Sequence, residues 1–569
     1  MKKPLFDRPP HYVYLTVVFA CFLSLTGCTT PAIRSQSPDN EELPEIPETT
    51  QLVEDLARPT GLKTLAVEGI GLVVGLDGTG GDPPPSSRRE ILINEMRTHR
   101  VFQPNRVLAS PETSLVLVRA FLPPGIQEGE RVDLEVLTPS NSTTTSLKGG
   151  YLMKTRLREI AVLNSQITQG KQMAIGQGDV LVDALLDGED DGVMLTKGRV
   201  LGGALSKATR ALGLVVSEEH HSVRTSAKIG AAINRRFNIY KHGSKRGVAT
   251  PKRDNFIQLD IHPRYKDNLA RYLQVVQSIA VREDSSDRLL RLQLLEHELL
   301  NPSTSARAAR RLEAMGKEAE RVLIKGIESA NEEVRFYAAE SLAYLDHAEA
   351  PSILADTIRR MPAFRHHALV ALKSMEQPKA FDELSELLHV DSAETRYAAF
   401  RALLEISPSD PMLVGENLDD VVFLHELGSA AQPLVHISRS TRPEIVAFGE
   451  DVRFASHSMV FAGGEITVRS DSDNRLKVTR FSAKKGDLKT FCDATVPDMV
   501  RAVVELGGSY DDVVKAIVQA HRQGNLACRV EFDALPELGR TYHRKDRDEP
   551  FVSDEDVKMS DEDPELKSL

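Results

Sequence analysis

The chain has 569 residues, which is too many for one hydrophobic core and predicts three or four domains. Hydrophobic residues make up 41% and charged residues 27%, as in ordinary globular proteins, and the absence of Trp argues against an aromatic-lined ligand cleft. A formal net charge of -11 excludes a general attraction to nucleic acid or anionic lipid, although it leaves room for a local basic patch.

Residues 1–27 have the pattern of an export signal. Basic residues precede an apolar run over residues 13–25, which is too short to cross a bilayer comfortably. The run closes with Leu25-Thr26-Gly27-Cys28, which resembles the bacterial lipobox. The sequence therefore predicts lipidation of Cys28 as the first residue of the mature chain. The alternative is a cut at another site that discards Cys28.

Residues 28–55 are a predicted flexible tether, because Pro, Glu, Ser and Thr dominate this segment and leave little to bury. The residue after Cys28 is Thr29 and not Asp. By resemblance to bacterial lipoproteins, this favours anchoring to the outer membrane.

The stretch from Val67 to Asp82, VEGIGLVVGLDGTGGD, predicts one buried strand held between Gly-rich turns. Gly-rich loops also cradle phosphates, but no Lys-Ser or Lys-Thr follows the glycines here. Three prolines after Asp82 prevent a helix from opening at once, as the dinucleotide fingerprint requires. Nucleotide binding is therefore the weaker interpretation.

Residues 56–150 predict a strand-rich α+β domain, with short apolar runs cut by Gly and Pro and one helix near residues 88–99. Leu115 to Val118 is apolar on both faces, which predicts a strand buried on both sides. The strands are expected at residues 72–76, 114–122 and 132–137.

This region resembles the flagellar basal-body P-ring protein family. The resemblance rests on four pieces in the family's order: the Gly-rich strand, Leu122-Pro123-Pro124-Gly125, the segment 129–133 and the segment 146–150. Because order and spacing match together, the resemblance is specific. It implies an exported structural protein that forms a ring. Typical members carry no lipid, so the lipobox is a departure from the family.

Residues 151–285 predict a second α+β domain in which the resemblance is less sharp. We expect Thr225 or Ser226 to cap a helix that runs to Phe237. A strand at 256–261 and a helix at 265–279 follow. The acidic turn at 187–191 lacks the calcium-loop spacing and is interpreted as a solvated turn.

Residues 286–412 predict an all-helical solenoid of HEAT-like repeats. Similar Ala-rich segments close with Leu312, Leu342, Leu372 and Leu403, at intervals of 30, 30 and 31 residues. Such an array presents a long surface, so we expect it to bind a partner protein; the alternative is a plain spacer.

Residues 413–540 predict a C-terminal domain in which the family pattern resumes. Residues 443–449 and 464–468 are interpreted as two strands around a turn, and residues 496–520 as a helical hairpin that ends at Gly524. Residues 541–569 predict an acidic disordered tail. The whole chain is thus predicted to be α+β, with strand-rich ring-forming domains interrupted by a solenoid.

Cys492 and Cys528 are the two cysteines outside the signal, and an even pair in an exported protein is compatible with a disulfide. Two buried free thiols are the alternative that the sequence leaves open. Neither His220-His221 nor His366-His367 has the spacing of a zinc helix, and no nucleophile motif is found. We therefore expect no metal, no cofactor and no enzymatic activity.

The expected function is a periplasmic ring around the flagellar rod. The implied partners are the protein itself, the rod, the outer-membrane ring proteins and the membrane through its lipid, with peptidoglycan contact left open and no nucleic acid. A monomeric outer-membrane lipoprotein that binds an envelope protein or peptidoglycan is the alternative. An Arg131–Asp133 pair across a subunit boundary, or a solvated strand edge, is expected in the segment 129–133. The expected assembly surface comprises Gly78, Thr79, Gly80, Gly81, Asp82, Pro123, Pro124, Arg131 and Asp133.

Overall fold

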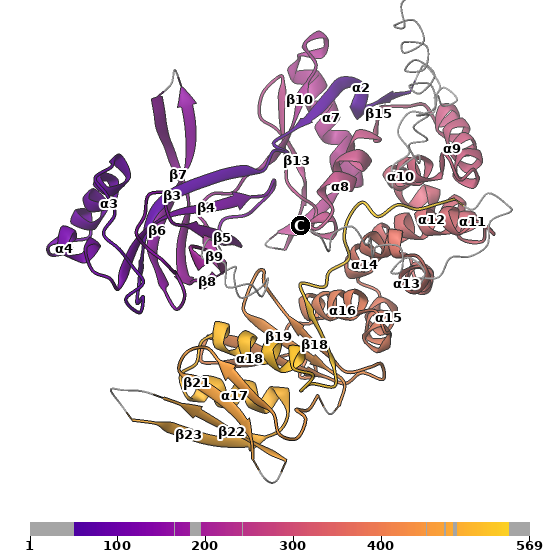
Figure 1. Ribbon diagram of the computed structural model, residues 1–569. Helices are drawn as coiled ribbons and strands as arrows, with labels where there is room; N and C mark the ends of the chain where they lie inside the picture. The colour runs from indigo at the N-terminus through magenta and orange to yellow at the C-terminus, as the bar shows by residue number, and fades with distance from the viewer. Residues whose placement is uncertain are drawn as a thin grey trace, which may run out of the picture. The chain divides into compact units, whose positions relative to one another are not determined.

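The computed structural model describes residues 50–163, 166–182, 195–241, 243–450, 452–471, 474–481 and 486–544 (Figure 1). The predicted signal peptide, Cys28, tether residues 28–49, the acidic turn at 187–191 and the tail beyond residue 544 lie outside these residues. The described residues from 50 to 538 belong to one compact unit. All elements described below belong to this unit.

The first sheet closes on itself. Its seven strands pair in the order β5-β4-β3-β6-β7-β9-β8, and β5 also pairs with β9. Strands before and after residue 150 are neighbours, so the domain boundary expected between residues 150 and 151 lies inside one sheet. The strands are β3 Leu65–Val74, β4 Thr113–Leu122, β5 Arg131–Leu137, β6 Tyr151–Leu163, β7 Gln166–Asp179, β8 Leu181–Val182 and β9 Lys197–Ser206.

Strand β4 is buried on both sides, as its apolar run predicted. Val116 and Val118 face the interior of the closed sheet. Leu115 faces a smaller cluster with Leu72, which is covered by α3 (Ser87–Thr98) and α4 (Pro104–Leu108). Each face of the strand therefore has its own apolar partner.

A second sheet, of order β13-β14-β10-β2, carries two helices, α7 and α8. Helix α7 begins after Ser222, whose Oγ accepts the Thr225 N–H at 3.0 Å, so the cap expected at Thr225 or Ser226 is corrected to Ser222. Ile229 and Ile233 are buried on its inner face, as predicted. Two separate two-stranded pairs, β1 with β15 and β11 with β12, lie in the same part of the chain. The elements of this part are β1 Gln51–Leu52, α2 Val53–Leu56, β2 Ala57–Thr60, β10 Leu212–Val216, α7 Val223–Arg236, β11 Asn238–Lys241, β12 Ser244–Gly247, β13 Ala249–Pro251, β14 Phe256–Leu259, α8 Leu269–Gln277 and β15 Ala280–Arg282.

Eight α-helices follow, in the period that the sequence predicted. The repeat-closing residues Leu312, Leu342, Leu372 and Leu403 are all fully buried at 0% exposure, in α10, α12, α14 and α16. Because these four leucines fill the seam between successive helices, each repeat is stabilised by its neighbours. The helices are α9 Ser285–Leu300, α10 Ser305–Met315, α11 Glu320–Ile327, α12 Glu332–Tyr344, α13 Ala350–Arg360, α14 Arg365–Lys373, α15 Pro378–Glu386 and α16 Ala393–Ile406.

The C-terminal region contains two sheets. A five-stranded mixed sheet has the order β16-β17-β19-β18-β24, and a four-stranded antiparallel sheet has the order β20-β21-β22-β23. The strands are β16 Glu416–Leu418, β17 Val422–Leu427, β18 Leu434–Ile437, β19 Glu444–Phe448, β20 Met459–Ala462, β21 Ile466–Ser470, β22 Arg475–Arg480, β23 Leu488–Asp493 and β24 Arg529–Phe532.

Strands β19 and β21 belong to different sheets, so the expected pair at 443–449 and 464–468 is corrected: β19 pairs with β17 and β18, and β21 with β20 and β22. The sequence missed this because β20, a four-residue strand, intervenes. The expected helical hairpin is present as α17 (Val496–Glu505) and α18 (Tyr510–Arg522). Gly507 and Gly524, at φ +77° and +71°, end the two helices.

Candidate functional site

The Gly-rich loop after β3 is fastened to the rest of the closed sheet. Gly80 N–H donates to the Pro111 carbonyl at 2.8 Å, and Gly81 N–H to the Thr113 carbonyl at 3.1 Å. A Cβ on Gly80 would lie 2.2 Å from the Thr113 carbonyl oxygen, so only Gly fits there. Both N–H groups therefore form hydrogen bonds within the chain. Asp82 and Gly78, in contrast, are exposed.

The Leu122 to Gly125 turn packs against the second sheet's region. Gly125 has φ +78°, and a Cβ there would lie 2.2 Å from Ile261 Cδ1. The Arg210 guanidinium donates to the Leu122 carbonyl at 2.6 Å. Pro123 is exposed and Pro124 is half-buried, so only the outer edge of this turn is open to a neighbour.

Arg131 and Asp133 each form hydrogen bonds with other residues of the same chain. Arg131 Nη1 donates to the Gly202 carbonyl at 3.1 Å, and Asp133 Oδ1 accepts the Gly202 N–H at 2.6 Å. The Asp133 carboxylate also accepts the Thr441 N–H at 2.9 and 3.0 Å. These contacts connect the closed sheet to the loop between β18 and β19. The sequence analysis expected either a pair across a subunit boundary or a solvated strand edge, and it did not predict this connection.

Cys492 on β23 is half-buried and Cys528 is buried, and both are free thiols in the structure. Two free thiols were one of the two alternatives that the sequence left open, and a disulfide was the other. Burial raises the pKa of Cys528 to about 11, and burial together with Asp498 and Asp493 raises that of Cys492 to about 12. Both thiols are therefore protonated at neutral pH.

A buried ion cluster joins the first half of the solenoid to α8. Arg271 is 5% exposed and donates to Glu313 at 2.6 Å, while its Nη1 lies 2.6 Å from Glu340. Tyr265 Oη donates to the other Glu313 oxygen at 2.5 Å. Burial opposes ionisation of Arg271, but Glu313 and Glu340 raise its pKa above its ordinary range. The solenoid is thereby fixed to the second sheet's helices.

A second buried cluster joins the last repeat to the five-stranded sheet. Glu444 on β19 is 0% exposed and accepts from Tyr397 Oη at 3.0 Å and from Arg442 Nε at 2.7 Å. Burial would raise the pKa of Glu444, but His425, Arg401 and Arg442 lower it to about 2. The solenoid is therefore held at both ends by paired buried charges.

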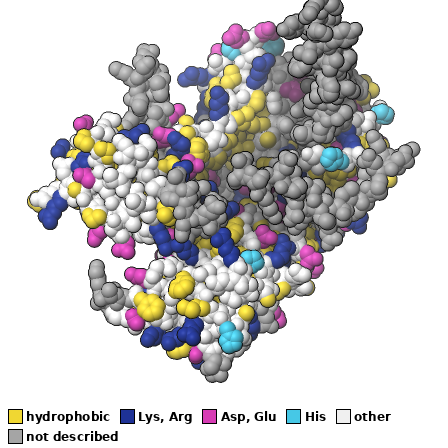
Figure 2. All heavy atoms as spheres, viewed as in Figure 1, with side chains coloured by type: hydrophobic (Ala, Val, Ile, Leu, Met, Phe, Trp, Pro, Cys, Tyr) yellow, Lys and Arg dark blue, Asp and Glu magenta, His cyan; other side chains and the backbone are white. Residues whose placement is uncertain are grey.

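The four-stranded sheet β20 to β23 has one covered and one open face. Alternate residues such as Val468 and Val478 are buried, while α17 contacts β22 and β23 and α18 contacts β20. The opposite residues point outward because side chains alternate along a strand. Met459, Phe461 and Phe491 among them are each about half exposed (48%, 50% and 48%). Figure 2 shows hydrophobic and basic side chains next to each other over β21 to β23.

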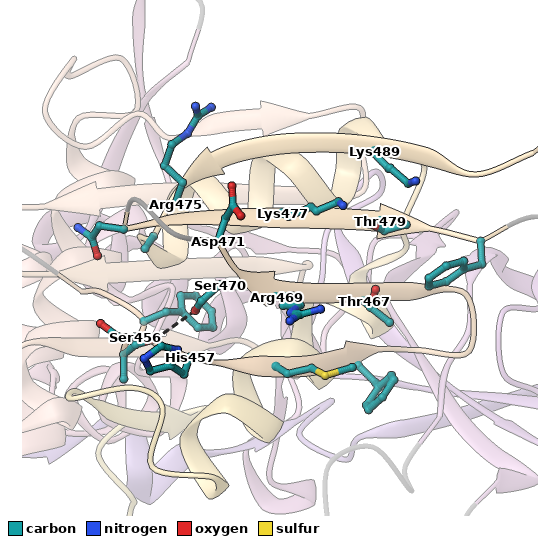
Figure 3. Close-up of a pocket in the computed structure, with 17 residues that line it drawn as sticks. Ser456, His457, Thr467, Arg469, Ser470, Asp471, Arg475, Lys477, Thr479 and Lys489 are labelled. Carbon is teal, nitrogen blue, oxygen red and sulfur yellow. Dashed lines mark hydrogen bonds between the residues drawn. The ribbon is translucent and has the colours of Figure 1, made fainter.

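Basic side chains lie among these apolar ones. Arg469, Lys477 and Phe491 are neighbours across three strands, because Arg469 pairs with Lys477 and Lys477 with Phe491. Arg469 and Lys477, together with Met459, Phe461 and residues of the adjoining loops, line a shallow hollow of about 860 Å³ (Figure 3). Arg475, Lys477 and Lys489 point outward from β22 and β23 in this view, and Asp471 is the acidic side chain beside them.

We call the outward residues of β20 to β23 the open sheet face. The sequence reasoning did not identify it, although the alternation of apolar and basic residues in β20 to β23 was a usable signal. The face combines cations with exposed aromatic rings, so it suits binding of a partner. The described residues contain no group of three or more His, Cys, Asp or Glu placed to hold a metal ion. None of the helices in this part of the chain is long and apolar enough to cross a membrane.

Two family models match separate parts of the chain. The model described as flagellar P-ring protein matches residues 52–291, and the model described as HEAT repeats matches residues 320–404. The first match ends within α9, where the solenoid begins. The resemblance of residues 413–540 to the closing part of the family therefore stays a prediction.

Curated relatives match over the same share of the chain. The flagellar P-ring protein of Thermotoga maritima is 28% identical over 250 residues, which is 42% of this chain and 70% of the relative. That of Anaeromyxobacter dehalogenans strain 2CP-C is 30% identical over 248 residues, 42% of this chain and 62% of the relative. The flagellar P-ring protein of Syntrophotalea carbinolica is 27% identical over 242 residues.

Proposed function

We propose, from the match of residues 52–291 to the flagellar P-ring protein family model, that the protein is a structural component of the flagellar basal body that assembles a ring around the rod in the periplasm. The family match over the closed sheet and the second sheet is the observation that carries the proposal.

A ring requires head-to-tail contacts between two different surfaces of each subunit. The exposed residues Gly78 and Asp82 and the edge at Pro123 supply one candidate surface. The open sheet face supplies a better formed one, because its apolar and basic side chains are half exposed. A second copy of the chain is complementary in charge to this basic face, because the whole chain carries a net charge of -11. Arg131 and Asp133 are left out of this surface because their contacts lie within the chain.

The solenoid has its own part in the proposal. Its inner contacts with α8 and β19 make it part of the framework, and its remaining surface is available for the rod, an outer-membrane ring protein or peptidoglycan. The lipid expected at Cys28 would keep the ring at the outer membrane.

Electron cryotomography of flagellar bases in cells with and without the gene tests the proposal. We expect a periplasmic ring density that disappears on deletion, together with motility. An unchanged basal body would refute it. The alternative, a monomeric outer-membrane lipoprotein, would then be pursued by identifying the envelope protein that the solenoid binds.

The assembly surface has its own test, in which the mass of the purified protein is measured by light scattering. Arg469→Glu with Lys477→Glu is expected to reduce self-association of the wild-type chain. The matched control, Lys317→Glu with Arg321→Glu, changes the net charge equally at exposed solenoid positions and should leave the mass unchanged. Equal effects of the two variants would exclude the open sheet face from the contact.

A further inference from the structure

One segment of this acidic chain is strongly basic. Residues 222–253 contain nine Lys or Arg and no Asp or Glu, within a protein of net charge -11. The segment comprises α7, the β11–β12 hairpin, β13 and the turn that leads to β14.

The turn and the base of the hairpin both contact α7. The Ser226 hydroxyl donates to the Asp254 carbonyl at 2.6 Å, and a Cβ on Gly230 would lie 2.9 Å from the Pro251 ring. The turn 251–254 therefore lies against the first half of α7. At its other end, Asn234 bonds both the N–H and the carbonyl of Ala249 at 2.8 Å, next to the base of the hairpin.

Seven of the nine cations are exposed, and we call these seven the basic patch. None of them forms an ion pair with another described residue. Three acidic side chains border the patch: Asp254 follows it, and Glu218 and Glu219 precede α7. The patch consists of Arg224, Lys228, Arg235, Lys245, Arg246, Lys252 and Arg253.

Two exposed side chains of apolar character accompany the basic patch. Tyr240 in the hairpin is 77% exposed, and Val223 at the start of α7 is 74% exposed. Tyr is the side chain that proteins place at the boundary between water and lipid, because its ring is apolar and its hydroxyl is polar. Unpaired cations beside such a ring are typical of a surface that rests on a membrane.

The first described residues lie near the same region. The described residues begin at Thr50, β1 pairs with β15, and α7 packs against β15. The expected lipid site Cys28 precedes Thr50 by 22 residues, which span at most about 75 Å. A lipid on Cys28 would therefore keep the basic patch within reach of the headgroups.

We propose that the basic patch binds the anionic headgroups of a phospholipid membrane and acts as a second membrane contact beside the N-terminal lipid. Stable anchoring by acyl chains commonly needs such a second signal. A headgroup surface repeats its phosphates over any distance, so it can meet cations that are spread along a helix, a turn and a hairpin. This contact does not depend on ring assembly, because it uses only the charge and exposure of residues 222–253.

Vesicle sedimentation tests the contact without the lipid. The full mature chain carrying Cys28→Ser is mixed with vesicles of phosphatidylcholine alone, or with about one third phosphatidylglycerol. We expect binding to the anionic vesicles only, and its loss between about 0.1 M and about 1 M salt. Lys245→Glu with Arg246→Glu should weaken binding more than roughly tenfold, since each cation contributes about fivefold.

Two controls make the result specific. Lys317→Glu with Arg321→Glu changes the net charge equally on the solenoid and should leave vesicle binding within about twofold of the Cys28→Ser chain. Circular dichroism verifies that both variants are folded. Binding to neutral vesicles, equal loss in the two variants, or no binding to anionic vesicles would overturn the proposal. So would binding to soluble polyphosphate without binding to vesicles, because it would assign the patch to a free polyanion.

Discussion

The carboxylate of Asp133 accepts the backbone N–H of Thr441 although 308 residues separate them in the chain. The same carboxylate accepts the Gly202 N–H at 2.6 Å, so one side chain joins β5, β9 and the loop between β18 and β19. This contact connects the region of the family match to the strands that follow the solenoid.

Replacing Asp133 should loosen this connection. Asp133→Ala leaves two backbone N–H groups without their acceptor, and we expect a loss of roughly 2 kcal/mol in the free energy of unfolding. Limited proteolysis should show faster cleavage at residues 438–443. Glu128→Ala, at an exposed position before β5, is the control and should have no effect. Equal cleavage rates in the two variants would contradict the role given to Asp133.

Gly202 tests the same contact from the other side. Its φ is +57°, and a Cβ would lie 2.3 Å from the Thr441 carbonyl oxygen. Gly202→Ala should therefore destabilise the protein by at least about 2 kcal/mol, measured by chemical denaturation. Gly464→Ala is the matched control because a Cβ there meets nothing within 4 Å, and it should change stability by less than about 0.5 kcal/mol.

Glu444 should make stability depend on pH in acid. Its pKa is lowered from 4.5 to about 2 in the folded protein, so the unfolded state binds the proton more tightly. The stabilisation is therefore complete above about pH 4.5 and is lost as the pH falls towards 2. Glu444→Gln should cost roughly 3 kcal/mol at neutral pH, and this difference from wild type should shrink over that window.

Urea denaturation of both proteins at several pH values measures this difference. Glu426→Gln, whose carboxylate is 52% exposed on the neighbouring strand β17, is the control and should show little change. A difference between wild type and Glu444→Gln that stays constant from neutral pH to about pH 3 would contradict the assignment.

Arg271 should hold the solenoid to α8. Arg271→Met leaves Glu313 and Glu340 buried without their cation, which we expect to cost about 3 to 5 kcal/mol. Hydrogen exchange should rise in α8, α10 and α12 and stay unchanged in β3 and β4. Arg282→Ala, at an exposed position on β15, is the control. Uniform exchange changes across the chain would instead indicate general unfolding.

The two thiols can be counted directly. The unfolded chain carrying Cys28→Ser and lacking the signal should titrate as two thiols without reductant, because Cys492 and Cys528 are both free. In the folded protein both should react slowly near neutral pH, since burial raises the pKa of each. Titration of no thiols before reduction would establish the disulfide instead.

The sequence by itself determined the local elements. The apolar run at Leu115 to Val118 specified a strand buried on both sides, because side chains alternate along a strand. The spacing of Leu312, Leu342 and Leu372 specified the solenoid, because an internal repeat of about 30 residues is typical of one. The family resemblance likewise rested on short ordered motifs, and residues 52–291 bear it out.

Only the tertiary structure decided the connections between elements. Asp133 and Thr441, Arg271 and Glu313, and Tyr397 and Glu444 are far apart in the chain, so no periodicity brings them together. The tertiary structure also decided the open sheet face, because the partners of β21 depend on which short strands pair. Strand pairing and the burial of charged side chains arise from contacts between segments that are distant in the chain. The sequence pattern of a single segment therefore does not specify these contacts.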